Sequence, residues 1–143
     1  MKTSFDIDRI VFDLLSKSQE LKSTLKGGIY YQDDRPDDSA DEDVVINTIT
    51  LTQDYLPQLA TSNVNIYVAD QTRRIKGVEQ VKPNLARLAK LTKIILEVLR
   101  GAQVEGLKII PESQSVLQEQ GARQHFCNIR SEERRVGKEC SEP

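Results

Sequence analysis

The stretch Asn63-Val64-Asn65-Ile66-Tyr67-Val68 alternates without a break between polar or half-polar residues and aliphatic ones. Side chains on a β-strand point to opposite faces in turn, so this period predicts a strand with one buried and one wet face. The face predicted to point inward carries Val64, Ile66 and Val68.

The segment from residue 44 to residue 52 is dense in β-branched residues and predicts a second strand. Its alternation places Val45, Ile49 and Leu51 on one face and threonines on the other. A strand with one apolar and one polar face is typical of antiparallel sheets. We therefore expect this strand and the one at 63–68 to be antiparallel neighbours.

Two segments have the spacing of amphipathic helices. From Asp6 to Lys26 the apolar residues recur every three or four positions, and Gly27-Gly28 can end the helix. Pro83 suits the first turn of a second helix, which a cation and a glycine close at Arg100-Gly101. The stripe of this second helix is Leu85, Leu88, Leu91, Ile95 and Leu99.

Three shorter segments complete the layout. Residues 29–32 predict a strand, residues 104–117 predict one or two strands interrupted around Pro111, and residues 124–130 predict a last strand. The predicted order is α-β-β-β-α-β-β, without the βαβ repeat that a parallel sheet requires. We therefore expect a single α+β domain over residues 1–130, with an antiparallel β-sheet and two helices packed on one face.

The segment after Arg130 differs from the rest. Its first residues, Arg-Ser-Glu-Glu-Arg-Arg-Val-Gly-Lys-Glu-Cys at 130–140, show no apolar period and resemble one reading frame of a common DNA sequencing adapter. We therefore expect residues 131–143 to be a non-native tail, which fold reasoning sets aside. A natural charged terminus is the alternative.

Composition narrows the function classes. The 143 residues include 20 Lys and Arg against 22 Asp and Glu, a balance that argues against a general nucleic-acid coat. No apolar run reaches eighteen residues, so no membrane span is expected. The first residues lack the apolar core of a signal peptide, so an intracellular product is expected.

Candidate chemistry is sparse. His125 and Cys127 lie two apart on a predicted strand and share a face, but they supply only half of a zinc site, and nothing else supports a nucleophile. The acids at 33–43 lack the glycine and final glutamate of a calcium loop. We expect no catalytic residue, no metal and no cofactor, and hence no enzyme.

Charge is unevenly distributed. Residues 33–43 hold seven acids and one base and predict a mobile loop, whereas residues 72–100 hold eight bases and two acids. The basic segment can be an ordinary solvated surface, the contact of a small DNA- or protein-binding regulator, or a surface that meets the acidic loop of a second copy. The candidate interface residues are Asp33, Asp34, Asp37, Asp38, Asp41, Glu42, Asp43, Arg73, Arg74 and Lys76.

The layout resembles the tail completion and head–tail joining (tail terminator-like) proteins of tailed bacteriophages. The residues that carry the resemblance are Leu14-Leu15, Gly28-Ile29-Tyr30, Pro36 and the β-rich run from Asp43 to Thr48. The resemblance covers about residues 5–130 and implies a non-enzymatic α+β subunit that forms a homo-oligomeric ring, often hexameric.

The same resemblance implies where such a subunit works. Its partners would be copies of itself and tail-tube or neck proteins, without a membrane, a cofactor or specific nucleic-acid binding. It would be a structural protein of the virion, assembled in the cytoplasm of the bacterial host.

Overall fold

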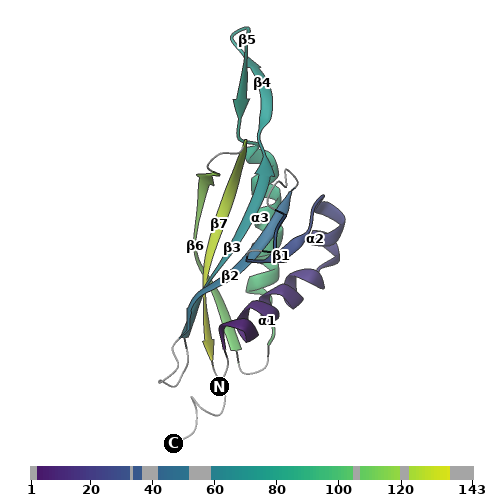
Figure 1. Cartoon of the computed structure of the whole chain (residues 1–143). Helices are drawn as coiled ribbons and strands as arrows, with labels where there is room; N and C mark the ends of the chain where they lie inside the picture. Colours follow the sequence, from purple (N-terminus) through teal and green to yellow (C-terminus); the bar gives the residue numbers. More distant parts are fainter. Residues whose placement is uncertain are drawn as a thin grey trace, which may run out of the picture.

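The alternating stretch around Val64 forms part of β3 (Leu59–Ala69), the central strand of a five-stranded sheet in the computed structural model (Figure 1). Its neighbours are β2 (Asp43–Leu51) and β7 (Gln124–Arg135), and the edges are β1 (Ile29–Tyr31) and β6 (Leu107–Gln118). The structure describes residues 3–32, 34–36, 42–51, 59–104, 107–119 and 123–135.

The antiparallel pairing of β2 with β3 is confirmed, but the inward set on β2 differs from the prediction. Val44 and Ile46 lie opposite Ile66 and Val64 and share the buried face with them. Ile49 is 44% exposed, and a bulge between Thr48 and Thr50 shifts the register so that Leu51 lies opposite the buried Ala60. Val45, also predicted inward, is opposite Asn65 and so lies on the other face.

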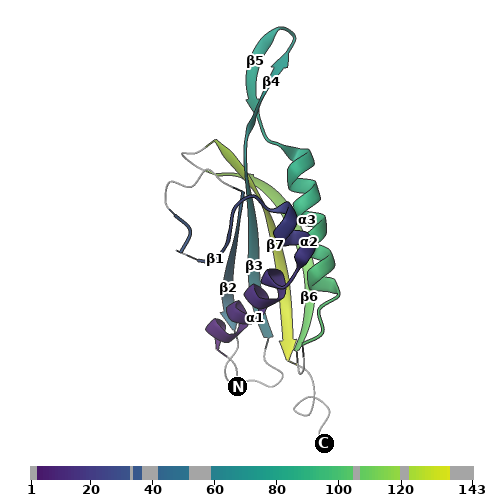
Figure 2. The same cartoon turned by 90° about the vertical axis from the view of Figure 1, so that its right-hand side faces the viewer.

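Three helices cover one face of the sheet (Figure 2). They are α1 (Ser4–Ser16), α2 (Gln19–Thr24) and α3 (Leu85–Arg100). The single helix predicted over 6–26 is therefore two helices. The Ser18 hydroxyl accepts a hydrogen bond from the Leu21 N–H at 3.2 Å and so caps a new helix in the middle of the predicted one.

The main core lies between these helices and the inner face of the central strands. The helices contribute Val11, Leu15, Leu21, Leu91 and Ile95, and the strands contribute Val44, Ile46, Val64, Ile66, Val68, Cys127 and Ile129. The inward set predicted for β3 is therefore confirmed. A smaller cluster around Ile7, Ala60 and Leu107 closes the end of the sheet near the first turns of α1.

The α+β class is confirmed, but the sheet is not wholly antiparallel. Strand β1 runs parallel to β2, with Ile29 opposite Val44. The chain turns at Gly27, where an added Cβ would lie 1.9 Å from the Glu42 carbonyl oxygen, so only glycine allows this approach. The parallel edge strand follows directly from that close crossing.

Of the two C-terminal strands, β6 lies close to its predicted bounds and β7 is longer than predicted. Strand β6 is continuous, and its register shifts between Pro111 and Ser113, at the interruption expected for a proline in a strand. Strand β7 continues past Arg130 to Arg135, and Glu133 lies opposite Ala60 of β3. The domain boundary at residue 130 and the non-native origin of the residues after it stay predictions.

A second sheet of two strands, β4 (Gln71–Ile75) and β5 (Val78–Lys82), lies before α3 in a segment for which no element was predicted. Lys76 and Gly77 make the turn with φ of 52° and 80°. Positive φ at both positions matches the right-handed twist of a hairpin. The hairpin projects beyond the end of the main sheet (Figures 1 and 2).

Candidate functional site

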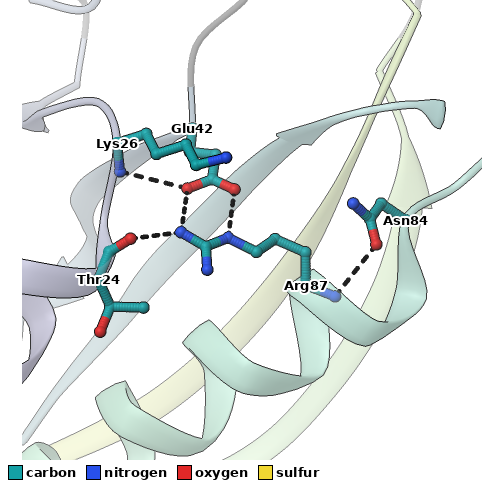
Figure 3. A network of polar contacts seen from close by, with 5 residues as sticks. All are labelled: Thr24, Lys26, Glu42, Asn84 and Arg87. Atoms are coloured by element: carbon teal, nitrogen blue, oxygen red, sulfur yellow. Dashed lines mark hydrogen bonds and ion pairs between the residues drawn. The ribbon is translucent and has the colours of Figure 1, made fainter.

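Glu42, predicted to lie in a mobile interface loop, is instead buried against Arg87 of α3 (Figure 3). Arg87 Nε and Nη2 donate to the two carboxylate oxygens of Glu42 at 2.5 and 2.8 Å. The Lys26 N–H also donates to Glu42, and Arg87 donates to the Thr24 carbonyl oxygen. This network joins the end of α2, the start of β2 and the start of α3.

The electrostatics of Glu42 follow from these contacts. Burial alone would raise its pKa, but the hydrogen bonds from Arg87 and from the Lys26 N–H, together with the charge of Arg87, lower the pKa overall. Asn84 caps α3 by accepting from the Arg87 N–H at 3.2 Å, which holds the arginine at the first turn of the helix. Glu42 is therefore a structural ion-pair partner.

Asp43 is the second acid that the structure removes from the candidate interface. It is buried, and its Oδ2 accepts from Arg35 Nε at 2.8 Å while its Oδ1 accepts from the Gly28 N–H at 3.0 Å. The Arg35 guanidinium also stacks over the Tyr67 ring at 4.1 Å from the centroid. A solvated loop was the wrong expectation for Glu42 and Asp43, because arginines within the fold neutralise both.

Of the other predicted acids, the structure describes only Asp34. Asp34 is exposed, and Asp33, Asp37, Asp38 and Asp41 lie outside the described residues. Arg73 and Arg74 on β4 and Lys76 in the turn are exposed on the projecting hairpin. The acidic segment 33–43 and the basic segment 72–100 meet within one chain through Glu42 and Arg87, and the role of their other charges at an interface stays a prediction.

His125 and Cys127 share the inner face of β7, as their spacing predicted, but they do not form a pair. His125 Nδ1 lies 2.7 Å from Asp70 Oδ1, at the base of the hairpin, while Cys127 packs in the core. A search of the described ranges finds no group of three or more His, Cys, Asp or Glu side chains that could hold a metal ion.

A buried carboxyl lies under α1. Glu133 is 1% exposed; its Oε1 accepts from the Ser131 hydroxyl at 2.7 Å, and its Oε2 has no hydrogen-bond partner among the described residues. Burial raises the pKa of Glu133 to about 7, against the lowering effect of its hydrogen bonds. Asp8 is nearby and accepts from Thr48 Oγ1 at 2.5 Å, and burial also raises its pKa.

An open groove of about 680 Å³ lies between α3 and β6. Its lining includes Leu88, Leu96, Val116 and Cys127, with Lys93, Glu97 and Arg100 among the charged members. The Thr92 hydroxyl also belongs to this lining; it is buried and has no hydrogen-bond partner among the described residues. The groove is therefore apolar with one unsatisfied polar group.

One side of the groove is an exposed strand. β6 is an edge strand of the main sheet, and Val116 and Leu117 are 49% and 47% exposed. Leu85, at the start of α3 and also in the groove lining, is 57% exposed. In the described ranges, none of the helices is both long and apolar enough to cross a membrane.

Comparisons with known proteins find a similarity of fold and no matching sequence family. No family model and no curated protein matches the sequence. Among solved structures, the fold is similar to a chain in a structure described as the virion of a native gene transfer agent particle, with a TM-score of 0.58 and 12% identity. The match covers 89% of this chain and 92% of the other, so the two chains share a fold over nearly their full lengths.

Sequence reasoning missed the hairpin, the groove and both arginine–carboxylate pairs. The hairpin did have a signal, because Lys76-Gly77 is a two-residue turn candidate between two short segments that both carry β-branched residues. The Glu42–Arg87 pair had none, since the two residues lie 45 positions apart in the chain, whereas Arg35 and Asp43 are eight positions apart and both fell in the segment expected to be a mobile loop. The groove depends on how β6 lies against α3, which is a tertiary property.

Proposed function

We propose that this chain is a structural protein of a phage-like virion, and more specifically a subunit that assembles into a ring at the tail end or at the head–tail junction. The observation that carries the coarser part is the shared fold with a chain of a gene transfer agent virion, over 89% of this protein. The ring, the tail completion role and the head–tail joining role rest on the family resemblance of the sequence.

The surfaces of the chain support a protein that works through contacts. A hairpin with Arg73, Arg74 and Lys76 exposed projects from the main sheet, and an apolar groove lies beside an edge strand. Both are features that a second protein surface can cover. The proposed role is non-enzymatic, and the partners are further copies of the chain and tail-tube or neck proteins.

The test measures the mass of the full chain in solution and its binding to assembled particles. A ring subunit is expected to give a discrete multiple of 16.2 kDa by light scattering, alone at high concentration or together with tail-tube protein. Labelled protein should then co-sediment with assembled particles. A chain that stays monomeric under all these conditions and does not associate with particles would contradict the proposal.

A DNA- or protein-binding regulator is the second candidate, and the exposed cations of the hairpin favour it. Arg73, Arg74 and Lys76 could contact phosphates, in which case binding would weaken steeply with salt. Binding of a DNA duplex that persists at physiological salt and is lost in an Arg73→Gln, Arg74→Gln, Lys76→Gln variant would favour this candidate. Binding seen only at low salt would leave the virion role preferred.

A further inference from the structure

Two unpartnered apolar surfaces of this chain have complementary forms. Among the described residues, the exposed large hydrophobic side chains include Val78 and Val81 on the hairpin and Leu85 and Val116 in the groove lining, whereas Leu117, also exposed, lies on the other face of β6 opposite Phe126. A two-stranded hairpin is marginal without a further layer, and an edge strand with exposed apolar side chains is a ready site for strand addition. In the described part of the chain, β5 and β6 each lack a neighbouring strand on one edge, so each could pair with the other.

We infer that β5 of one copy adds to the edge of β6 in a second copy, antiparallel, with Val78 opposite Val116, and that this is the contact that builds the proposed ring. The inference rests on the proposed function and names its interface. The antiparallel direction places Lys82 near Glu112 at one end of the pairing and Lys76 near Glu119 at the other. The run between these two glutamates, residues 113–118, carries no charge.

Side-chain parity fits the same register. Val116 is opposite the buried Cys127 in the main sheet, so it faces the groove side. On the hairpin, Ile75 pairs with Val78 and Arg73 pairs with Gln80, which places all four side chains on one face and Val81 on the other. Val78 and Ile75 then cover the mouth of the groove, and the Gln80 amide is positioned on the side of the unsatisfied Thr92 hydroxyl.

The arrangement also explains why a ring, and not a pair, is expected. The hairpin and the groove are different surfaces of one chain, so each copy uses its hairpin on one neighbour and its groove on the other. Head-to-tail contacts of this kind continue until the rotation closes. A reciprocal exchange between only two copies would instead stop at a dimer.

Disulfide trapping in the full chain tests the register. In a Cys140→Ser background, the Val78→Cys, Val116→Cys variant is expected to give a ladder of covalent multimers on oxidation. The control carries Val78→Cys and Phe5→Cys, because Phe5 is 81% exposed at the start of α1 and away from the groove. The control should stay monomeric on a denaturing gel. Equal ladders from both variants, or no ladder from either, would overturn the inference.

Charge reversal gives a second readout that does not depend on new cysteines. Lys82→Glu is expected to weaken association by about tenfold, and Glu112→Lys in the same chain is expected to restore it. Unchanged association in Lys82→Glu, with an unchanged unfolding midpoint, would overturn the inference. Multimers without the ladder would remove this interface and leave the proposed ring, whereas a ladder that stops at the dimer would keep the contact and remove the ring.

Discussion

At the scale of single residues, two arginines hold the end of the acidic segment 33–43 in the fold by pairing with its last two acids. Arg87 and Arg35 neutralise Glu42 and Asp43, the only two of its seven acids that the structure shows buried. A buried carboxylate without a partner is costly, since water no longer solvates its charge. The pairs therefore fix where the segment re-enters the sheet, and they leave it fewer charges for a partner.

Removing Arg87 is expected to be more damaging than removing the whole pair. Arg87→Met leaves Glu42 buried and unpaired, and we expect the free energy of unfolding to fall by about 3 kcal/mol. The Glu42→Gln, Arg87→Met double variant should recover part of the loss, because no charge is left buried. Urea unfolding of both variants at pH 7.5 measures the difference, and equal stability of the two would contradict the role given to Glu42.

Glu133 predicts an unusual pH dependence. Its pKa is about 7 in the folded chain against 4.5 in the unfolded one, so the folded chain binds the proton more tightly. The free energy of unfolding should therefore decrease as pH rises from about 4.5 to 7, by about 3 kcal/mol, and level off above pH 7.

The check on Glu133 is a set of urea titrations between pH 4.5 and 8. Asp8, whose pKa is also raised by burial, faces the same space from α1 and contributes in the same direction. Glu133→Gln removes the titrating group and is expected to flatten the profile above pH 5.5, with Asp8 unchanged. A wild-type profile that rises with pH over this interval would show that Glu133 is not buried as described.

At the scale of elements, the strands and helices that periodicity predicted are present, and the exceptions have local causes. The alternation of β3 and the stripe of α3 from Leu88 onward are confirmed because each repeats over several turns or pairs, whereas Leu85 in the first turn is exposed. On β2, the inward set was wrong because a bulge cannot be read from alternation. The break after α1 was missed although the apolar residues pause between Leu15 and Leu21, where Ser18 caps a new helix. The parallel direction of β1 depends on the crossing at Gly27.

The hairpin is expected to contribute to assembly and little to folding. Its strands form a separate sheet, so replacing residues 71–82 by a short Gly-Ser linker should leave the free energy of unfolding of the remainder within about 0.5 kcal/mol of wild type. The same replacement should abolish multimers. Light scattering and urea unfolding on one preparation measure both effects, and a large loss of stability would mean that the hairpin belongs to the core.

At the scale of the whole molecule, the α+β class and the packing of helices on one face of the sheet could be predicted from the sequence. The projecting hairpin and the groove were not predicted. Charge blocks pointed to an acidic loop and a basic segment, but the structure uses Glu42, Asp43 and Arg87 internally and presents Arg73, Arg74 and Lys76 on a hairpin. Ion pairs and grooves form between distant segments, so composition along the chain does not reveal them.

Residues 131–135 give a prediction about the whole domain. They complete β7 between β3 and β6, and Ser131 is buried there. Ending the chain after Arg130 is expected to lower the unfolding midpoint clearly, because Leu59–Ser62 and Leu107–Pro111 lose their partner strand. Ending it after Arg135 should have no such effect. If the shorter chain were as stable as the longer one, the last third of β7 would not be part of the fold.

The register shift at Pro111–Ser113 has a consequence for solubility. A long, flat, unprotected strand would template endless stacking of identical copies, which is how aggregates grow. Here the proline lacks an N–H and the bulge bends the rim of β6, so a continuous ladder along its whole length is excluded. Because of this irregularity, the exposed apolar edge of β6 can pair with a short strand but cannot support the continuous stacking of a fibril.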